Sequence, residues 1–246
     1  VLGSRGLGDV YKRQNINIYN FMKNKLCMLL LASGIGLFSC AEQDLPKEYT
    51  DSVNVFIGTG GHGHTFPGAT LPHGMVQLSP DTRLFGWDAC SGYYYDDTSI
   101  MGFTHTHLSG TGIGDYGDIL FMPVVGEKPL IAGTAENPDE GYRSRFSHEQ
   151  ESARPGYYQV LLQDDSINVE LTATERCGIQ RYTFPKAEAA IFLNLKKAMN
   201  WDFTNDSHIE VVDSVTIQGY RYSDGWARDQ RIYFLSLIHI SEPTRP

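Results

Sequence analysis

Short apolar runs with a two-residue period fill the second half of the chain. Runs rich in Val, Ile, Leu, Tyr and Thr occupy residues 159–164, 167–184, 189–195, 209–222 and 230–236, and Asp, Asn, Gly and Pro separate them. In one run Val169, Leu171 and Ala173 alternate with polar residues, as in a strand with one face in water. Outside the apolar segment at 26–38, no window sustains a helical period over three turns. Because half-buried strands bury their apolar faces best against one another, the pattern predicts an all-β fold, a β-sandwich.

An apolar segment near the N-terminus is typical of an export signal. Met22 is followed by two lysines and then by the apolar residues 26–38, which are too few for a bilayer-spanning helix. Residues 37–40, Leu-Phe-Ser-Cys, resemble a bacterial lipobox. We therefore predict a lipoprotein signal peptide at 22–40, lipidation of Cys40, and an exported protein held on a bacterial membrane in the periplasm or at the cell surface. The alternative is an ordinary secretory signal in which Cys40 has no role.

The two ends of the chain differ from the rest. Residues 1–14 and 236–246 resemble translated cloning or adaptor sequence, with disordered native tails as the alternative. We interpret residues 1–21 as a non-native or untranslated leader and residues 236–246 as a non-native tail. The remaining segment, 41–235, is long enough for one sizeable core.

The charge and the cysteines limit the function further. A formal net charge of -9 argues against nucleic-acid binding, because the chain has no excess of basic residues to neutralise phosphates, and a neutral sugar fits better. Of the four cysteines, only Cys90 and Cys177 belong to the expected domain. A disulfide between them is possible, but free and mostly buried thiols are the favoured interpretation.

Gly, His and aromatic residues are concentrated between residues 53 and 123. Five of the eight histidines lie in this block, which indicates a polar ligand surface built on loops. Its glycines lack the Lys and Ser/Thr of a phosphate-binding loop and a surrounding βαβ unit, which disfavours a nucleotide site. His105 and His107 have the spacing of a strand pair, but no further ligand pattern accompanies them, so a zinc site is also disfavoured.

Several motifs in one order resemble a single enzyme family. They are FIGTGGHGHTFPGAT, GMVQLSPDT, GWDACSGY, HTHLSGTG followed by DYGDIL, RPGYYQV, ELTATER and GYRYSDGWARDQRIYF. Over about Tyr49 to Phe234 the chain resembles the N-terminal part of glycoside hydrolase family 92, the calcium-dependent exo-acting α-mannosidases. The resemblance implies a β-sandwich followed, in the whole protein, by an (α/α)6 barrel that this chain does not contain.

The resemblance also implies how the chemistry is divided. In the family the acid, the base and the calcium ligands lie mostly on the barrel, so no catalytic residue and no metal ligand is assigned here. The spacing of the chain's own carboxylates selects no acid–base pair. The whole enzyme is expected to remove terminal α-mannose from N-glycans or mannan with inversion. Its partners are expected to be mannose-containing glycans, its own barrel and the membrane.

Six residues of the matching motifs are predicted to bind substrate. Trp87 is the main candidate, because an indole face complements the C–H face of a pyranose. The others are His62, His64, Phe66, Cys90 and His107, of which the histidines could hydrogen-bond sugar hydroxyls. The alternatives are a packing role for Trp87 and loop-bracing hydrogen bonds for the histidines. Asp115 and Asp118 are expected to brace their turn.

A second class of function stays open at this point. A non-enzymatic carbohydrate-binding sandwich would need only an aromatic surface that binds sugar without help from a second domain. A structural adaptor domain would need neither a sugar-binding surface nor catalytic residues. A catalytic barrel encoded in frame after residue 234 would favour the enzyme.

Overall fold

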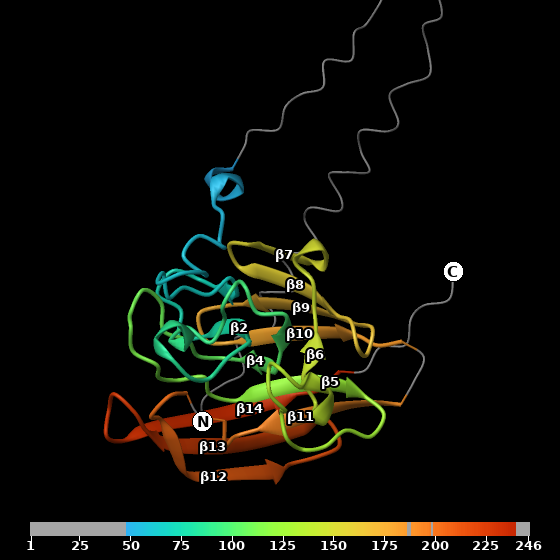
Figure 1. The fold of residues 1–246 in the computed structure, drawn as a ribbon. Helices are drawn as coiled ribbons and strands as arrows, with labels where there is room; N and C mark the ends of the chain where they lie inside the picture. Colours follow the sequence, from blue (N-terminus) through green and yellow to red (C-terminus); the bar gives the residue numbers. More distant parts are fainter. Residues whose placement is uncertain (1–47, 186–187, 198, 240–246) are drawn as a thin grey trace, which may run out of the picture. The chain divides into compact units, whose positions relative to one another are not determined.

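The computed structural model describes residues 48–185, 188–197 and 199–239. The expected leader at 1–21, the signal peptide at 22–40 with Cys40, and residues 240–246 of the expected tail lie outside the described residues. In the described part the chain forms antiparallel sheets and short 3₁₀ helices (Figure 1). The prediction of an all-β fold is confirmed.

The strands of the described residues form four sheets. The five-stranded sheet has the order β1 (Ala69–Thr70), β2 (Gln77–Asp81), β4 (Gly102–Thr104), β5 (Leu120–Val125), β11 (Ala189–Asn194). The four-stranded sheet has the order β10 (Gly178–Thr183), β9 (Ile167–Ala173), β8 (Tyr157–Leu162), β7 (Glu151–Arg154). A third sheet contains β12 (Phe203–Val211), β13 (Thr216–Asp224) and β14 (Gln230–Leu237), and a fourth pairs β3 (Ser99–Ile100) with β6 (Ser144–Arg145). The 3₁₀ helices are η2 (Tyr49–Ser52), η3 (Trp87–Ala89), η4 (Pro138–Glu140) and η5 (His148–Gln150).

One apolar core lies between the five-stranded and four-stranded sheets. Leu78, Phe103 and Met122 from the first sheet are completely buried in the same cluster as Val160 and Val169 from the second. Strand β9 has the expected alternation, with every second side chain buried from its first residue to its last. The two sheets therefore bury their apolar faces against each other, which is the sandwich arrangement that the two-residue period predicts.

The sheet of β12, β13 and β14 is built differently. It lies in the lower part of the domain in Figure 1, below β5 and away from the strands β7 to β10. Its buried side chains are polar, namely Arg221, Ser223 and Gln230. Strand β12 is at the edge of this sheet and has a register shift, a β-bulge, between Thr204 and Asp206. Strand β14 ends at Leu237, two residues beyond the expected domain boundary.

Both cysteines of the described residues are free thiols. Cys90 is buried, as expected. The expectation of a buried thiol is wrong for Cys177, because this residue lies in the exposed turn between β9 and β10.

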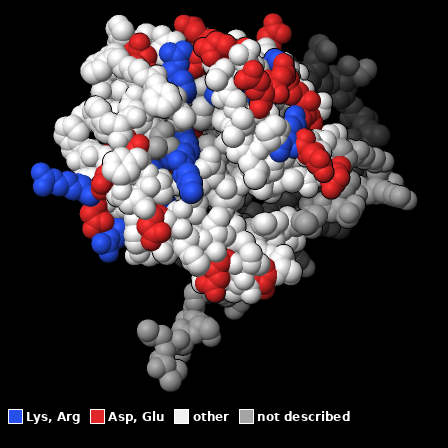
Figure 2. All heavy atoms as spheres, turned by 60° about the horizontal axis from the view of Figure 1, so that its bottom comes forward, with Lys and Arg blue, Asp and Glu red and all other residues white. Residues whose placement is uncertain are grey.

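The surface of the described residues fits the acidic composition. Figure 2 shows one face on which acidic side chains lie in separate groups, with broad uncharged surface between them. None of the helices that the structure describes is long and apolar enough to cross a membrane.

Candidate functional site

An open hollow of about 450 Å³ lies beside helix η3. It is lined by aromatic rings, glycine backbone, one thiol and one amide: Phe85, Gly86, Trp87, Cys90, Gly112, Gly114, Asn200 and Trp201. Trp87 and Trp201 are 61% and 56% exposed, so both indoles present most of their surface to solvent. Contiguous exposed apolar surface often marks a ligand-binding groove or an interaction site. The hollow is therefore the best candidate for a ligand site among the described residues.

Helix η3 places Trp87 at the mouth of the hollow. Gly86 precedes the helix with a φ of 101°, a conformation that favours glycine. The thiol of Cys90 donates a hydrogen bond to the Trp87 carbonyl oxygen over 2.7 Å and so closes the short helix. Burial raises the pKa of this thiol above its ordinary value, so Cys90 is a structural thiol and not a reactive one.

A glycine-rich loop, residues 108–117, also lines the hollow, through Gly112 and Gly114. A Cβ atom at Gly112 would lie 2.0 Å from Cη2 of Trp87, and a Cβ atom at Gly114 would lie 1.9 Å from Nδ2 of Asn200. Only glycine permits such contacts, so the loop backbone fits directly against both side chains. The amide of Asn200 also accepts a hydrogen bond from the Gly86 N–H over 3.0 Å, which joins the Trp201 segment to the Trp87 segment.

Two of the predicted histidines, together with Asp88, lie beside Trp87 and are not among the residues that line the hollow. His62 is exposed and its Nδ1 lies 2.7 Å from Asp88 Oδ1, at hydrogen-bond distance. This hydrogen bond is the main reason why the pKa of Asp88 is below its ordinary value. His64 is buried, with its ring edge-on to Trp87 at 5.0 Å between centroids and its Nε2 3.4 Å from the same Asp88 oxygen. The His62–Asp88 pair can present polar atoms to a ligand, whereas His64 supports the indole.

The structure does not bring the other two predicted residues, Phe66 and His107, to the hollow. Phe66 packs against the sandwich core and against the His107 ring, at 5.1 Å between centroids. His107 is buried and both of its ring nitrogens have internal partners, the Gln77 carbonyl oxygen at 2.7 Å and Asp81 Oδ1 at 3.0 Å. A ring that is saturated in this way has no nitrogen left for a sugar hydroxyl.

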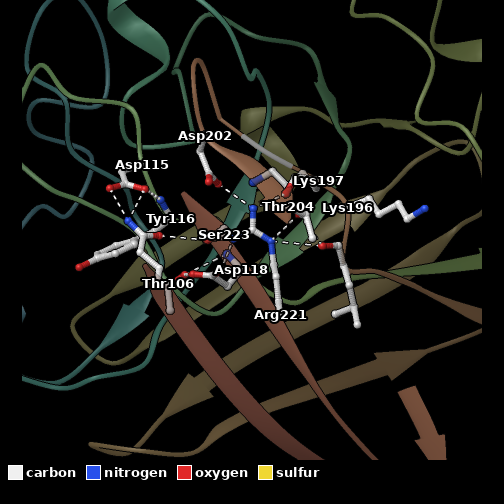
Figure 3. A network of polar contacts seen from close by, with 12 residues as sticks. Thr106, Asp115, Tyr116, Asp118, Lys196, Lys197, Asp202, Thr204, Arg221 and Ser223 are labelled. Carbon is white, nitrogen blue, oxygen red and sulfur yellow. Dashed lines mark hydrogen bonds and ion pairs between the residues drawn. The ribbon is translucent and has the colours of Figure 1, made fainter. Parts of the chain in front are cut away.

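Beneath the hollow lies a group of buried charges, which we call the ionic layer: Asp81, His107, Asp118, Lys197, Asp202 and Arg221. Arg221 forms ion pairs with Asp118 at 2.5 Å and Asp202 at 2.7 Å (Figure 3). Lys197 forms an ion pair with Asp81 at 2.8 Å. Burial alone would raise the pKa of Asp81, but Lys197 and His107 outweigh it and bring the pKa to about 2.

Asp115 in the glycine-rich loop and Asp118 directly after it brace their turn, as expected, and also contact other elements. Asp115 accepts a hydrogen bond from the Tyr116 N–H within the turn, and further ones from the Trp226 N–H at 2.8 Å and from Gln230 Nε2 at 2.9 Å. Asp118 binds the Thr106 hydroxyl at 2.6 Å as well as Arg221. The loop is thereby fixed to strands β13 and β14.

The sequence interpretation missed Trp201, Asn200 and the charged residues Lys197, Asp202 and Arg221. The segment Asn200-Trp201-Asp202 carried one signal, because a tryptophan between two short polar residues is unusual for a core position. Nothing in the sequence pairs Arg221 with carboxylates that are far away along the chain.

The described residues contain no group of three or more His, Cys, Asp or Glu side chains that could hold a metal ion. His105 has other partners, since its Nδ1 lies 2.8 Å from the Ile119 carbonyl oxygen and its Nε2 3.2 Å from the Gln180 amide nitrogen. The calcium that the family resemblance implies stays a prediction.

Solved structures similar to this chain are family 92 enzymes. A family GH92 α-mannosidase from Bacteroides thetaiotaomicron, solved in complex with mannoimidazole, is 45% identical, with a TM-score of 0.74 over 76% of this chain and 24% of its own. A GH92 inverting mannosidase from Bacteroides thetaiotaomicron VPI-5482 is 29% identical, with a TM-score of 0.60 over 77% of this chain and 25% of its own. The chain thus spans about a quarter of each of these proteins.

Sequence comparisons agree with the structural ones. An uncharacterized secreted glycosidase from Arthroderma benhamiae is 32% identical over 146 residues, which make up 56% of this chain and 17% of that protein. The family described as Glycosyl hydrolase family 92 N-terminal domain matches residues 52–245. This chain therefore belongs to glycoside hydrolase family 92, of which it carries the N-terminal β-sandwich domain.

Proposed function

We propose that this chain is the N-terminal domain of an exported α-mannosidase and that its hollow binds the terminal mannose of the substrate. One observation carries this proposal, namely that Trp87 and Trp201 are both mainly exposed and both line one hollow with glycine backbone between them. An indole face complements the C–H face of a pyranose, and glycine backbone lets the sugar come close. The similarity to an α-mannosidase that was solved with mannoimidazole supports mannose as the sugar.

The whole enzyme needs groups that the hollow does not supply. Inversion requires one carboxylic acid and one carboxylate about 6.5–9.5 Å apart, on opposite faces of the sugar. Among the residues that the structure describes, no carboxylate lines the hollow, and Asp88 beside it is bound to His62. We propose that a second, (α/α)6 domain supplies the acid, the base and the calcium ligands, and that water attacks the anomeric carbon directly with inversion. One of the similar solved structures is an inverting mannosidase, which agrees with this proposal.

If the second domain holds the catalytic groups, the chain alone should bind a mannoside without hydrolysing it. The chain by itself should release no mannose from any α-mannoside, with or without calcium, while still binding a methyl α-mannoside at the hollow. Mannose release and ligand titration on the same sample test both statements. Calcium-dependent hydrolysis would show instead that two carboxylates of this domain form the catalytic pair.

The role of Trp87 is best measured in a complete enzyme, in which the second domain closes the site. Trp87→Ala should lower kcat/KM by about one to three powers of ten, or about 1.4–4 kcal/mol of transition-state stabilisation. The melting temperature should change little, because Trp87 is 61% exposed and lies outside the sandwich core. Trp226→Ala is a matched control, since Trp226 is 70% exposed and does not line the hollow. An early loss of stability with near-normal kcat/KM would assign Trp87 to packing.

Export and membrane anchoring form a separate part of the proposal. They rest on the signal-like segment at 22–40, and the similarity to a secreted glycosidase agrees with export. Cys40→Ser in a bacterial host should move the protein from the membrane fraction to the soluble exported fraction, because the acyl chains supply most of the membrane affinity. An unchanged distribution would favour an ordinary signal peptide.

A further inference from the structure

Arg221 is the most highly connected side chain of the ionic layer. It is 1% exposed, and its guanidinium donates hydrogen bonds to six acceptors (Figure 3). These are Asp118 Oδ1, Asp202 Oδ2, the Ser223 and Thr204 hydroxyls and the carbonyl oxygens of Leu195 and Lys197. All three guanidinium nitrogens are engaged, so the plane of the group is fixed from several directions.

One set of contacts of Arg221 leads to the side of the hollow that Gly112 and Gly114 form, which we call the glycine wall. Asp118 lies directly after the glycine-rich loop, and its second oxygen accepts a hydrogen bond from Thr106 at the other end of the loop, over 2.6 Å. The Gly117 N–H donates to the Thr106 carbonyl oxygen over 2.9 Å. Arg221 therefore holds the closed base of the loop whose Gly112 and Gly114 line the hollow.

The second set of contacts of Arg221 leads to the side of the hollow that Trp201 forms, which we call the Trp201 wall. Asp202 is 4% exposed and bound to Arg221, whereas Trp201 beside it is 56% exposed and lines the hollow. The Asp202 N–H donates to the Met199 carbonyl oxygen over 2.8 Å and forms a tight turn. The buried carboxylate anchors this turn, so the neighbouring indole points outward.

The buried ion pairs of Arg221 contribute more to the positions of Asp118 and Asp202 than to the stability of the fold. Burial is the main reason why the pKa of Asp202 is above its ordinary value, although Arg221 opposes this effect. Buried ion pairs seldom stabilise a fold more than well-packed apolar residues would, because both ions lose their hydration. A planar guanidinium with fixed donor directions does, however, hold two carboxylates at a set separation.

We propose that Arg221 is a positioning residue that fixes the distance between the glycine wall and the Trp201 wall of the hollow. Through Asp118 it holds the loop with Gly112 and Gly114, and through Asp202 it holds Trp201. The width of the hollow then follows from one side chain that does not itself touch the ligand. Only the nature of the ligand, a mannoside, rests on the proposed function.

The test uses Trp201 as a reporter of its own wall. In the 246-residue chain, Trp87→Phe and Trp226→Phe leave Trp201 as the single tryptophan. Asp202→Asn and Arg221→Lys are then introduced separately, and acrylamide quenching and fluorescence anisotropy of Trp201 are measured. Asp202→Asn is nearly isosteric and keeps the proposal testable if Arg221→Lys fails to fold. We expect the quenching constant to rise about twofold and the anisotropy to fall in both variants, because the turn loses its anchor.

Arg143→Lys is the matched control. Arg143 is also buried, but its guanidinium binds Ser99 and the Thr82 carbonyl oxygen, none of which lines the hollow. This variant should lower the melting temperature and leave the quenching of Trp201 unchanged. Folded Asp202→Asn protein with parental quenching would overturn the proposal, as would an equal change in Arg143→Lys.

Ligand titration in the three-tryptophan background separates this inference from the proposed function. If the hollow binds methyl α-mannoside, Asp202→Asn should weaken the affinity about threefold or more, whereas Arg143→Lys should not. If the parent chain binds no mannoside while Trp201 responds as expected, the proposed function fails and the positioning role of Arg221 stands.

Discussion

The sandwich core and the ionic layer are both buried, but they are held together in opposite ways. The core consists of apolar side chains such as Phe103 and Leu162 from two facing sheets, and its attraction has no preferred direction. The ionic layer consists of three carboxylates with lysine, arginine and histidine, each within a few ångströms of a specific partner. The core can therefore tolerate changes of shape that conserve volume, whereas the layer depends on the reach and direction of each group. The candidate ligand site lies over the layer that tolerates the least change.

Truncation should be severe in both regions. Phe103→Ala should destabilise the domain by about 3–5 kcal/mol, because it leaves a cavity at a completely buried position. Arg221→Met should cost a similar amount, about 3–5 kcal/mol, because Asp118 and Asp202 would stay buried without their cation. Urea unfolding followed by circular dichroism measures both. A loss below about 1 kcal/mol for Arg221→Met would mean that the layer is solvated and not a buried ionic group.

Conservative substitutions should reduce the free energy of unfolding less in the sandwich core than in the ionic layer. Leu162→Met keeps the volume of a completely buried core side chain and should cost less than about 1.5 kcal/mol. Arg221→Lys keeps the charge, but a single ammonium cannot reproduce the fork that reaches two aspartates, so its cost should exceed that of Leu162→Met. Equal losses of unfolding free energy for the two variants, measured by urea unfolding, would show that the core and the ionic layer do not differ in this way.

Acid should weaken the layer and leave the core unaffected. The pKa of Asp81 in the folded chain is about 2, below the value of 3.8 for a free aspartate, so its charged form stabilises the fold at higher pH. This contribution, about 2 kcal/mol, is complete above pH 4 and is lost as the pH falls through 2. Urea midpoints measured between pH 6 and pH 2.5 should fall more steeply for the parent chain than for Asp81→Asn. Parallel profiles would contradict the assignment of this charge to the folded state.

The side chains that line the hollow should move more easily than those of the ionic layer. Gly112→Ala places a Cβ 2.0 Å from Trp87, and the exposed indole should swing away at little cost in stability. The tryptophan emission maximum and the mannoside affinity report the displacement. Gly60→Ala is the control, because its Cβ would meet only ordinary contact, 3.6 Å from Tyr95. Unchanged emission and affinity in Gly112→Ala would show that the close fit of Trp87 to the loop has no effect on the site.

The smallest effect is expected at Cys177. Because its thiol is exposed in a turn, Cys177→Ser should change stability by less than about 0.5 kcal/mol. A thiol reagent should modify Cys177 rapidly and Cys90 only after unfolding, since Cys90 is buried and burial raises its pKa. Rapid modification of both thiols in the folded chain would show that η3 opens readily.

The sandwich could be predicted because its signal is periodic. Val169, Leu171 and Ala173 alternate with polar residues in the sequence, and the same residues are buried in β9. Trp87 could be singled out because family resemblance marks its motif, and the structure places it in the hollow. Nothing in the local sequence, by contrast, reveals that Asp118 and Asp202 meet Arg221, because ion pairs between distant residues produce no periodic pattern in the sequence. For the same reason the sequence left two roles open for His107, a contact with a sugar hydroxyl or internal hydrogen bonds, and the structure shows internal hydrogen bonds with Gln77 and Asp81.

Strand β12 bears on how the chain behaves at high concentration. Its pairing with β13 shifts register between Thr204 and Asp206, as at a β-bulge, and the strand carries the acidic residues Asp206 and Glu210. A bulge interrupts the regular row of N–H and C=O groups that a strand from another molecule would pair with, and like charges repel a second copy of the same edge. This edge should therefore resist intermolecular β-pairing, which protects the domain against aggregation through β12.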